Sequence, residues 1–264
     1  KIFQNIMNEQ KYPQLERLHV LRTEALCSIR DRAFDTFPLF MENYGDGIIS
    51  GCRPITTPNT ITLSTGIILY NKFFYLIKEP MSVEYSPTEE YMMMKLIFDP
   101  QLETENFVQR NVSIILTPNL NLSENEMEIC RFKLKKGAVL RTNYTDFFDR
   151  ATEFDTVNTI NVPYAAVGGS TLSPEILCAF ADDAKNFELD FEDYNFCLAA
   201  LSGNILNSAQ IVFYIERRLK IELPAQINNQ ILYEHLCLIL QEIKNGRRRE
   251  IIGTRRRRRE IIVE

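Results

Sequence analysis

The segment Gly66–Ile77 reads Gly-Ile-Ile-Leu-Tyr-Asn-Lys-Phe-Phe-Tyr-Leu-Ile, and the fold class expected for this chain follows from it. Two short runs of β-branched and aromatic residues flank the dipeptide Asn71-Lys72. A two-residue hairpin turn needs a left-handed backbone, which Asn tolerates better than most residues. The segment therefore predicts a β-hairpin with its turn at Asn71 and Lys72.

The strand pattern continues on both sides of this hairpin, from Tyr44 to about Leu140. Short β-branched or aromatic runs are separated by Gly, Pro and Asn residues, which is typical of strands and turns. In Thr60–Leu63 hydroxyl and apolar side chains alternate, as in an antiparallel sheet with one buried face. The expected strands are 48–50, 60–64, 66–70, 73–77, 91–98, 111–116 and 128–134. Their spacing predicts a small antiparallel sandwich or barrel.

Helical patterns lie before and after the strands. From about Pro13 to Ala33, apolar residues recur at three- and four-residue spacing. After the strands, Ser173-Pro174-Glu175 has a capping hydroxyl followed by Pro at the first helical position. Further helices are expected at 191–201, 208–219 and 225–244, the last closed by Asn245-Gly246. The order is that of an α+β fold with an N-terminal helix, a small antiparallel β-sandwich and a C-terminal helical cluster with a basic tail.

This order predicts the division of the chain. We expect an N-terminal helical segment at 1–43, a β-sandwich shell at 44–142, a connector at 143–172, a helical domain at 173–246 and an Arg/Ile-rich docking tail at 247–264.

Composition and charge indicate a folded body with a tail of opposite charge. The 264 residues are 45% hydrophobic and carry a net charge of −5, which is unlike a disordered chain. No run approaches the ~18 apolar residues of a membrane span. Residues 245–264 hold eight Arg and three Glu, so the tail is basic and the rest of the chain is acidic.

The tail contains a near-repeat, Arg-Arg-Arg-Glu-Ile-Ile, at 247–252 and 257–262. An acidic body with a basic tail favours a docking tail over a body that coats nucleic acid. The Ile pairs allow a strand that augments a partner's sheet while Arg reaches its acidic surface. Contact with nucleic acid or an anionic membrane stays open because Arg binds phosphate, although the tail has no aromatic residues for base stacking. A solvated tail without function is a third interpretation.

The residue types that carry chemistry do not form a catalytic or metal-binding pattern. The six Cys are scattered singly and the only His are His19 and His235, so no zinc site, redox pair or Ser/His/Asp triad is predicted. Acidic residues cluster at Asp182-Asp183 and Glu188–Asp193, where we interpret them as the first turns of helices. We predict no catalytic residue, metal or cofactor, and no enzymatic activity.

The N-terminal helix has two interpretations. Its apolar residues, Leu15, Leu18 and Ile29 among them, pack on the chain's own domain or form a helical bundle with copies of the chain or with a partner.

Gly45–Gly51 and Ile61–Leu76 resemble a pattern in phage-tail and baseplate proteins, in which a strand ending in Ser-Gly precedes a strand-turn-strand unit. Tail-fibre attachment domains and the shell domain of the type VI secretion baseplate adaptor are similar, also in the order of their parts. Lys72 stands where this pattern usually has Gly. The resemblance implies a structural adaptor that anchors a fibre or wedge component in a virion tail or injection-machine baseplate, assembled in the bacterial cytoplasm.

The implied partners are other baseplate or tail proteins and copies of the chain itself, a trimer being one option. The residues expected to make these contacts are Leu15, Leu18, Ile29, Arg247, Arg248, Arg249, Arg255, Arg256, Arg257, Arg258, Arg259, Ile261 and Ile262.

Two alternative functions follow from other residues. A receptor- or carbohydrate-binding module of a tail tip would use exposed loop aromatics, with Tyr85, Tyr91 and Tyr144 as candidates. A cell-envelope glycan hydrolase would use Asp190 and Asp193 of the acidic cluster.

Overall fold

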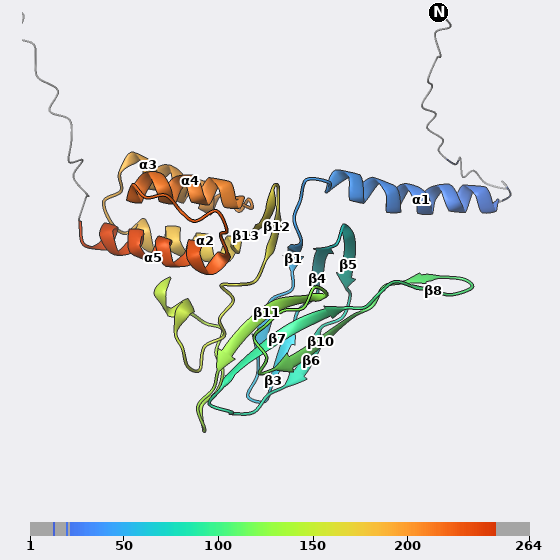
Figure 1. The fold of residues 1–264 in the computed structure, drawn as a ribbon, viewed down its shortest axis with the longest axis horizontal. Coiled ribbons are helices and arrows are strands. Elements are labelled where there is room, and N and C mark those ends of the chain that lie inside the picture. Colours follow the sequence, from blue (N-terminus) through green and yellow to red (C-terminus); the bar gives the residue numbers. More distant parts are fainter. Residues whose placement is uncertain (1–12, 14–19, 21, 247–264) are drawn as a thin grey trace, which may run out of the picture.

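The computed structural model of this chain describes Pro13, Val20 and residues 22–246. An N-terminal helix, a β-rich body and four C-terminal helices follow one another, which confirms the predicted α+β class. In Figure 1 the C-terminal helices lie at one end of the long axis and the N-terminal helix at the other. The basic tail lies outside the described residues.

The helices are α1 (Thr23–Phe40), α2 (Pro174–Ala184), α3 (Phe191–Leu201), α4 (Ser208–Leu219) and α5 (Asn229–Lys244), with the 3-10 turn η1 (Phe148–Ala151). The strands are β1 (Gly47–Gly51), β2 (Pro54–Thr56), β3 (Thr60–Leu63), β4 (Gly66–Tyr70), β5 (Phe73–Ile77), β6 (Met81–Glu84), β7 (Tyr91–Phe98), β8 (Leu102–Glu103), β9 (Val108–Gln109), β10 (Val112–Thr117), β11 (Glu126–Lys133), β12 (Tyr164–Ala166) and β13 (Gly169–Thr171).

The strands form small sheets that enclose one apolar core. The largest has the order β13-β12-β1-β4-β5, and two three-stranded sheets have the orders β10-β7-β11 and β2-β3-β6. Pairing is antiparallel in all of them except between β1 and β12, which run parallel. Core residues from several sheets are at most 1% exposed, among them Ile48, Ile61, Leu63, Ile68, Met94, Leu96 and Phe132.

The β4–β5 hairpin has the predicted turn. Asn71 and Lys72 have φ angles of 47° and 64°, and Tyr70 pairs with Phe73 across the turn. The backbone N–H of Asn71 also donates to a carboxylate oxygen of Asp46 at 2.8 Å. The turn is therefore held by local backbone geometry and by a contact from the segment before β1.

Several short strands were not predicted because partners distant in sequence define them. The segment of β12, Tyr-Ala-Ala, lacks a β-branched run, and it becomes a strand by pairing with β1 and β13. Strand β2 begins with Pro54 at a sheet edge, where the missing N–H costs little. The strands β6, β8, β9 and β13 are four residues long or shorter.

The helix boundaries differ from the prediction at three places. Helix α1 begins at Thr23 rather than near Pro13, since Val20 and Arg22, which the structure describes, are not helical. Helix α1 continues past Ala33 to Phe40, with Pro38 inside its last turn. Most residues of its predicted first half lie outside the described part of the chain. Helix α5 begins at Asn229 rather than near Ala225, because the Asn228 side chain caps it by accepting from the backbone N–H of Ile231 at 2.9 Å.

The C-terminal helices surround a second core, in which Ile176, Phe180, Ile215, Leu236 and Ile239 are fully buried. Their starts are specified locally. Ser173 caps α2, Asp190 caps α3, and Asn207 forms a capping box with Gln210 at α4. The predicted limits 191–201 and 208–219 are confirmed.

The two cores meet where β1 lies beside β12. Gly45 and Gly47 allow this approach, since a Cβ on Gly47 would lie 2.6 Å from the backbone of Ala165 and one on Gly45 would lie 2.4 Å from Gly169. On the helical side, Thr171 Oγ1 donates to the carbonyl of Leu206 at 2.7 Å, and the Asn229 amide donates to the carbonyl of Val162 at 2.9 Å.

The hairpin turn gives a stability prediction. Lys72→Gly should raise the free energy of unfolding by about 1 kcal/mol, because Gly adopts positive φ without the steric penalty of a Cβ. Urea denaturation measures the change, and Lys72→Ala, which keeps the Cβ, is the matched control with little gain. Destabilisation by Lys72→Gly would contradict the assigned turn.

Candidate functional site

Helix α1 projects from the β-rich body (Figure 1). Its apolar side chains lie in solvent. Its large apolar residues are about half exposed or more, and include Leu26 (50%), Ile29 (47%), Phe34 (66%), Phe37 (55%) and Phe40 (73%). The ring of Phe37 packs edge-on against Phe74 of β5, with centroids 5.5 Å apart. Exposed apolar side chains grouped in this way make α1 a candidate interaction surface.

Leu26, Ile29, Phe37 and Phe40 share one face of α1 by their helical spacing. The charged residues Glu24 and Asp35 fall on the opposite face by the same spacing. We call the apolar side the α1 face. Ile29, expected from sequence to make contacts, belongs to it.

Other residues expected to make contacts lie outside the described part of the chain. They are Leu15, Leu18, Arg247, Arg248, Arg249, Arg255, Arg256, Arg257, Arg258, Arg259, Ile261 and Ile262.

A second projection is the β8–β9 hairpin, which extends toward the same end of the molecule as α1 (Figure 1). Every residue from Gln101 to Gln109 is exposed. Leu102, Phe107 and Val108 are 53%, 69% and 58% exposed. Sequence reasoning missed this surface because its strands contain only two residues each.

A third apolar surface is a groove of about 660 Å³ between α3 and α4. Its floor contains the stacked rings of Phe196 and Tyr214, whose centroids lie 3.9 Å apart. Phe191 and Phe213, which are 80% and 66% exposed, line its walls. The groove offers aromatic surface and few charges.

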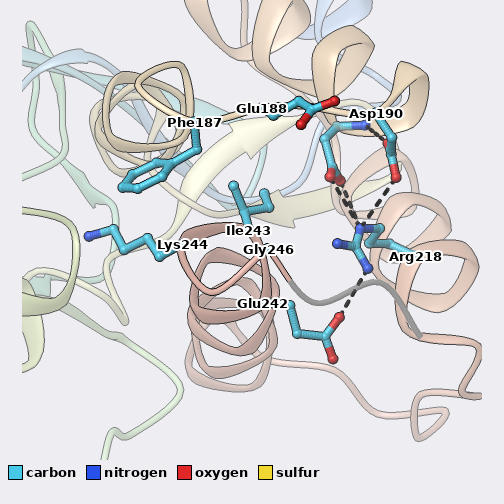
Figure 2. A pocket seen from close by; sticks show the side chains of 9 residues that line it. Phe187, Glu188, Asp190, Arg218, Glu242, Ile243, Lys244 and Gly246 are labelled. Atoms are coloured by element: carbon cyan, nitrogen blue, oxygen red, sulfur yellow. Dashed lines mark hydrogen bonds and ion pairs between the residues drawn. The ribbon is translucent and has the colours of Figure 1, made fainter. Parts of the chain in front are cut away.

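The acidic cluster surrounds a buried arginine at the ends of α3, α4 and α5 (Figure 2). Arg218 Nε donates to the two carboxylate oxygens of Asp193 at 3.0 and 3.2 Å, and one terminal nitrogen donates to Glu242 at 3.0 Å. Asp190 lies 3.9 Å from the same Nε. Tyr214 donates its hydroxyl proton to Asp193 at 2.7 Å.

The hydrogen bonds and the pKa directions in this cluster indicate that its charges stabilise the packing of α3, α4 and α5. Burial raises the pKa of Asp193, while the hydrogen bonds and positive charge supplied by Tyr214 and Arg218 oppose that rise. Burial also raises the pKa of the Tyr214 hydroxyl, which therefore stays a donor at neutral pH. The cluster ties three helices together through one guanidinium.

These contacts account for the two carboxylates of the hydrolase alternative. Asp190 caps α3 by accepting from the backbone N–H of Asp193 at 2.9 Å, and Asp193 is only 2% exposed and paired with Arg218. The cavity they line, about 390 Å³ in volume, also contains Glu188, Glu242 and Lys244. The prediction of acidic first turns is confirmed for α3 and wrong for Asp182 and Asp183, which lie in the last turn of α2.

The tyrosines of the carbohydrate-binding alternative differ in exposure. Tyr85 is 9% exposed and its hydroxyl donates to the carbonyl of Thr57, so its expected exposure is wrong. Tyr144 donates to the carbonyl of Val157, and the guanidinium of Arg150 lies 4.3 Å from its ring centroid. Tyr91 is 37% exposed.

The described residues include no group of three or more His, Cys, Asp or Glu placed to hold a metal ion. Within the same ranges, no helix has the length and apolarity needed to cross a membrane. His235 lies in α5 and its Nδ1 contacts the carbonyl of Ile231 at 2.8 Å, whereas His19 lies outside the described residues.

Comparison by sequence finds no matching family model and no matching curated protein. Among solved structures, a crystal structure of TssK is similar over 89% of this chain and 72% of that chain, with 9% identity and a TM-score of 0.41. A cryo-electron microscopy structure of the type VI secretion system TssK-TssF-TssG baseplate subcomplex is similar over 88% of this chain and 100% of that chain, with 8% identity and a TM-score of 0.40. A likeness at this level concerns the fold at most and assigns neither partners nor activity.

The Arg218 cluster generates a stability prediction with a built-in control. Arg218→Met should lower the free energy of unfolding by about 3–5 kcal/mol, because it leaves the buried Asp193 carboxylate without its cation. Arg217→Met, which removes the exposed pair with Glu192 on the same helix, should cost less than about 1 kcal/mol. Both values come from urea denaturation. Equal effects of the two substitutions would exclude a structural role for the cluster.

Proposed function

We propose that this chain is a structural adaptor of a bacteriophage tail baseplate or a related contractile injection machine, where it anchors a neighbouring component by protein–protein contacts. The α1 face is the observation that carries the proposal, because it places apolar side chains in solvent on a helix that projects from the body. The resemblance of Gly45–Gly51 and Ile61–Leu76 to baseplate proteins supports the choice of assembly.

The stability of α1 supports an assembly role. Most of the stability of a helix in a protein comes from packing an apolar face rather than from intrinsic helix propensity. Helix α1 contacts the body through the ring of Phe37, which packs against the ring of Phe74. Burial of each large apolar side chain would contribute about 1.5–3 kcal/mol, so a neighbour on the α1 face would stabilise α1 and the complex together.

We propose that copies of the chain associate through this face. Helices with an apolar stripe at three- and four-residue spacing pack against one another in bundles, and homo-oligomers usually have closed symmetry, most often that of a twofold dimer. A trimer remains one option. The Arg/Ile tail is proposed as a second docking segment toward a neighbouring protein.

Light scattering after size-exclusion chromatography tests the role of the α1 face. The full chain should form an oligomer at micromolar concentration, whereas the triple variant Leu26→Gln, Ile29→Gln, Phe40→Gln should be a monomer or dissociate at least tenfold more readily. Loss of about 1.4 kcal/mol of apolar burial is enough for a tenfold change.

The matched control is the pair Glu24→Gln and Asp35→Asn on the opposite face of the same helix. This variant should keep the mass of the unaltered chain, and circular dichroism should show that it also keeps the helix content of the unaltered chain. A monomeric unaltered chain, or equal masses for the chain and the triple variant, would overturn self-association through α1.

A further inference from the structure

The β8–β9 hairpin is a two-stranded sheet that is separate from the other sheets among the described residues. Leu102 pairs with Gln109 and Glu103 with Val108, and the turn is closed by a hydrogen bond from the Thr104 N–H to the carbonyl of Phe107 at 2.8 Å. An isolated hairpin of this kind is marginally stable in water, and a third strand or an apolar cover is needed for stability. Within the described residues, β8 and β9 pair only with each other, so each has an open outer edge.

The hairpin surface is both apolar and acidic. Leu102, Phe107 and Val108 provide its exposed apolar side chains, and Glu103 and Glu105 provide its charge. The nearest cation in sequence, Arg110, is already engaged at the base, where it donates to Gln101 at 2.7 and 3.1 Å and lies 3.5 Å from the ring centroid of Phe73. An open strand edge with these side chains suits a basic, β-branched strand.

The tail of the chain has this complementary chemistry. Residues 247–264 carry eight Arg and three Glu, and each Arg run is followed within one or two residues by a pair of Ile. Ile has high strand propensity, and Arg pairs with carboxylates through two parallel hydrogen bonds. The acidic hairpin and the basic tail are therefore opposite in charge, and both contain apolar residues.

The position of the tail favours a second copy as its source. The tail follows Gly246 at the end of α5, and Figure 1 places this end of α5 and the β8–β9 hairpin at opposite ends of the long axis. Fully extended, its 18 residues reach about 60 Å from Gly246. In a head-to-tail arrangement of two copies, the tail of one would begin beside the hairpin of the next.

We propose that the β8–β9 hairpin accepts the Arg/Ile tail of a second copy as a third strand, with Arg side chains paired to Glu103 and Glu105. The inference rests on the tail's proposed role as a docking segment and names its acceptor. The contact is heterologous, because two different surfaces meet, so repetition gives a closed ring or an open filament.

Photo-crosslinking in the full chain tests the inference. A ¹⁵N-labelled chain carrying Ile262→benzoylphenylalanine is mixed with unlabelled chain at natural sequence, irradiated and digested for mass spectrometry. We expect mixed heavy–light crosslinks to residues 101–109 of the unlabelled copy, and at least a fivefold loss of these crosslinks in 0.5 M NaCl.

When the unlabelled copy carries the acceptor variant Glu103→Lys, Glu105→Lys, the yield of mixed crosslinks should fall at least fivefold. Its matched control is Glu84→Lys, Glu90→Lys, which makes the same charge change at exposed residues outside the hairpin and should leave them unchanged. Crosslinks confined to one copy, crosslinks to other residues, or equal yields from the two variants would each overturn the inference. The triple α1 variant and its control both keep the tail, so the difference in mass between them reports on the α1 face alone, and failure here is distinguishable from failure of the proposed adaptor role.

Discussion

The parallel pairing of β1 with β12 is the constraint on which the rest of the structure depends. It places Ile48 beside Tyr164 and so joins residues from the start of the sandwich to residues that lead into the helices. Gly45 and Gly47 permit the backbones to approach, because any Cβ there would overlap the neighbouring strand segment. Once β12 is fixed, β13 pairs with it, and hydrogen bonds from Thr171 and Asn229 orient the helical core against the sheet. The two apolar cores therefore form one connected body.

Two elements project from this body. Helix α1 and the β8–β9 hairpin carry large apolar side chains into solvent although both cores are already filled, and they extend toward the same end of the molecule. The hydrophobic effect favours covering such surface, so the physical role that suits these projections is contact with neighbouring proteins. The acidic cluster at the other end has a different role, since Arg218 pairs with Asp193 and Glu242 and the charges are used in packing α3, α4 and α5.

The features that sequence reasoning found are those that depend on nearby residues. The turn at Asn71-Lys72, the capped helix at Ser173 and the limits of α3 and α4 follow from local patterns of turn residues, caps and helical spacing. The missed features depend on distant partners. Strand β12 exists through its pairing with β1, and the partners of Arg218 lie on two other helices. One signal pointed to Arg218, because it occupies the buried stripe of α4 that also contains Ile211, Tyr214 and Ile215, where a charge requires a partner. The hairpin surface could not be predicted because its two-residue strands give no periodicity.

The central claim is that α1 is a contact element stabilised by a neighbouring copy, and hydrogen–deuterium exchange of its amides tests the claim most directly. The full chain is measured at concentrations above and below the point where light scattering shows dissociation. The account predicts slow exchange over Thr23–Phe40 in the assembled chain and at least tenfold faster exchange after dilution, with β4 and β5 unchanged. Equal exchange of the α1 amides at both concentrations would contradict it.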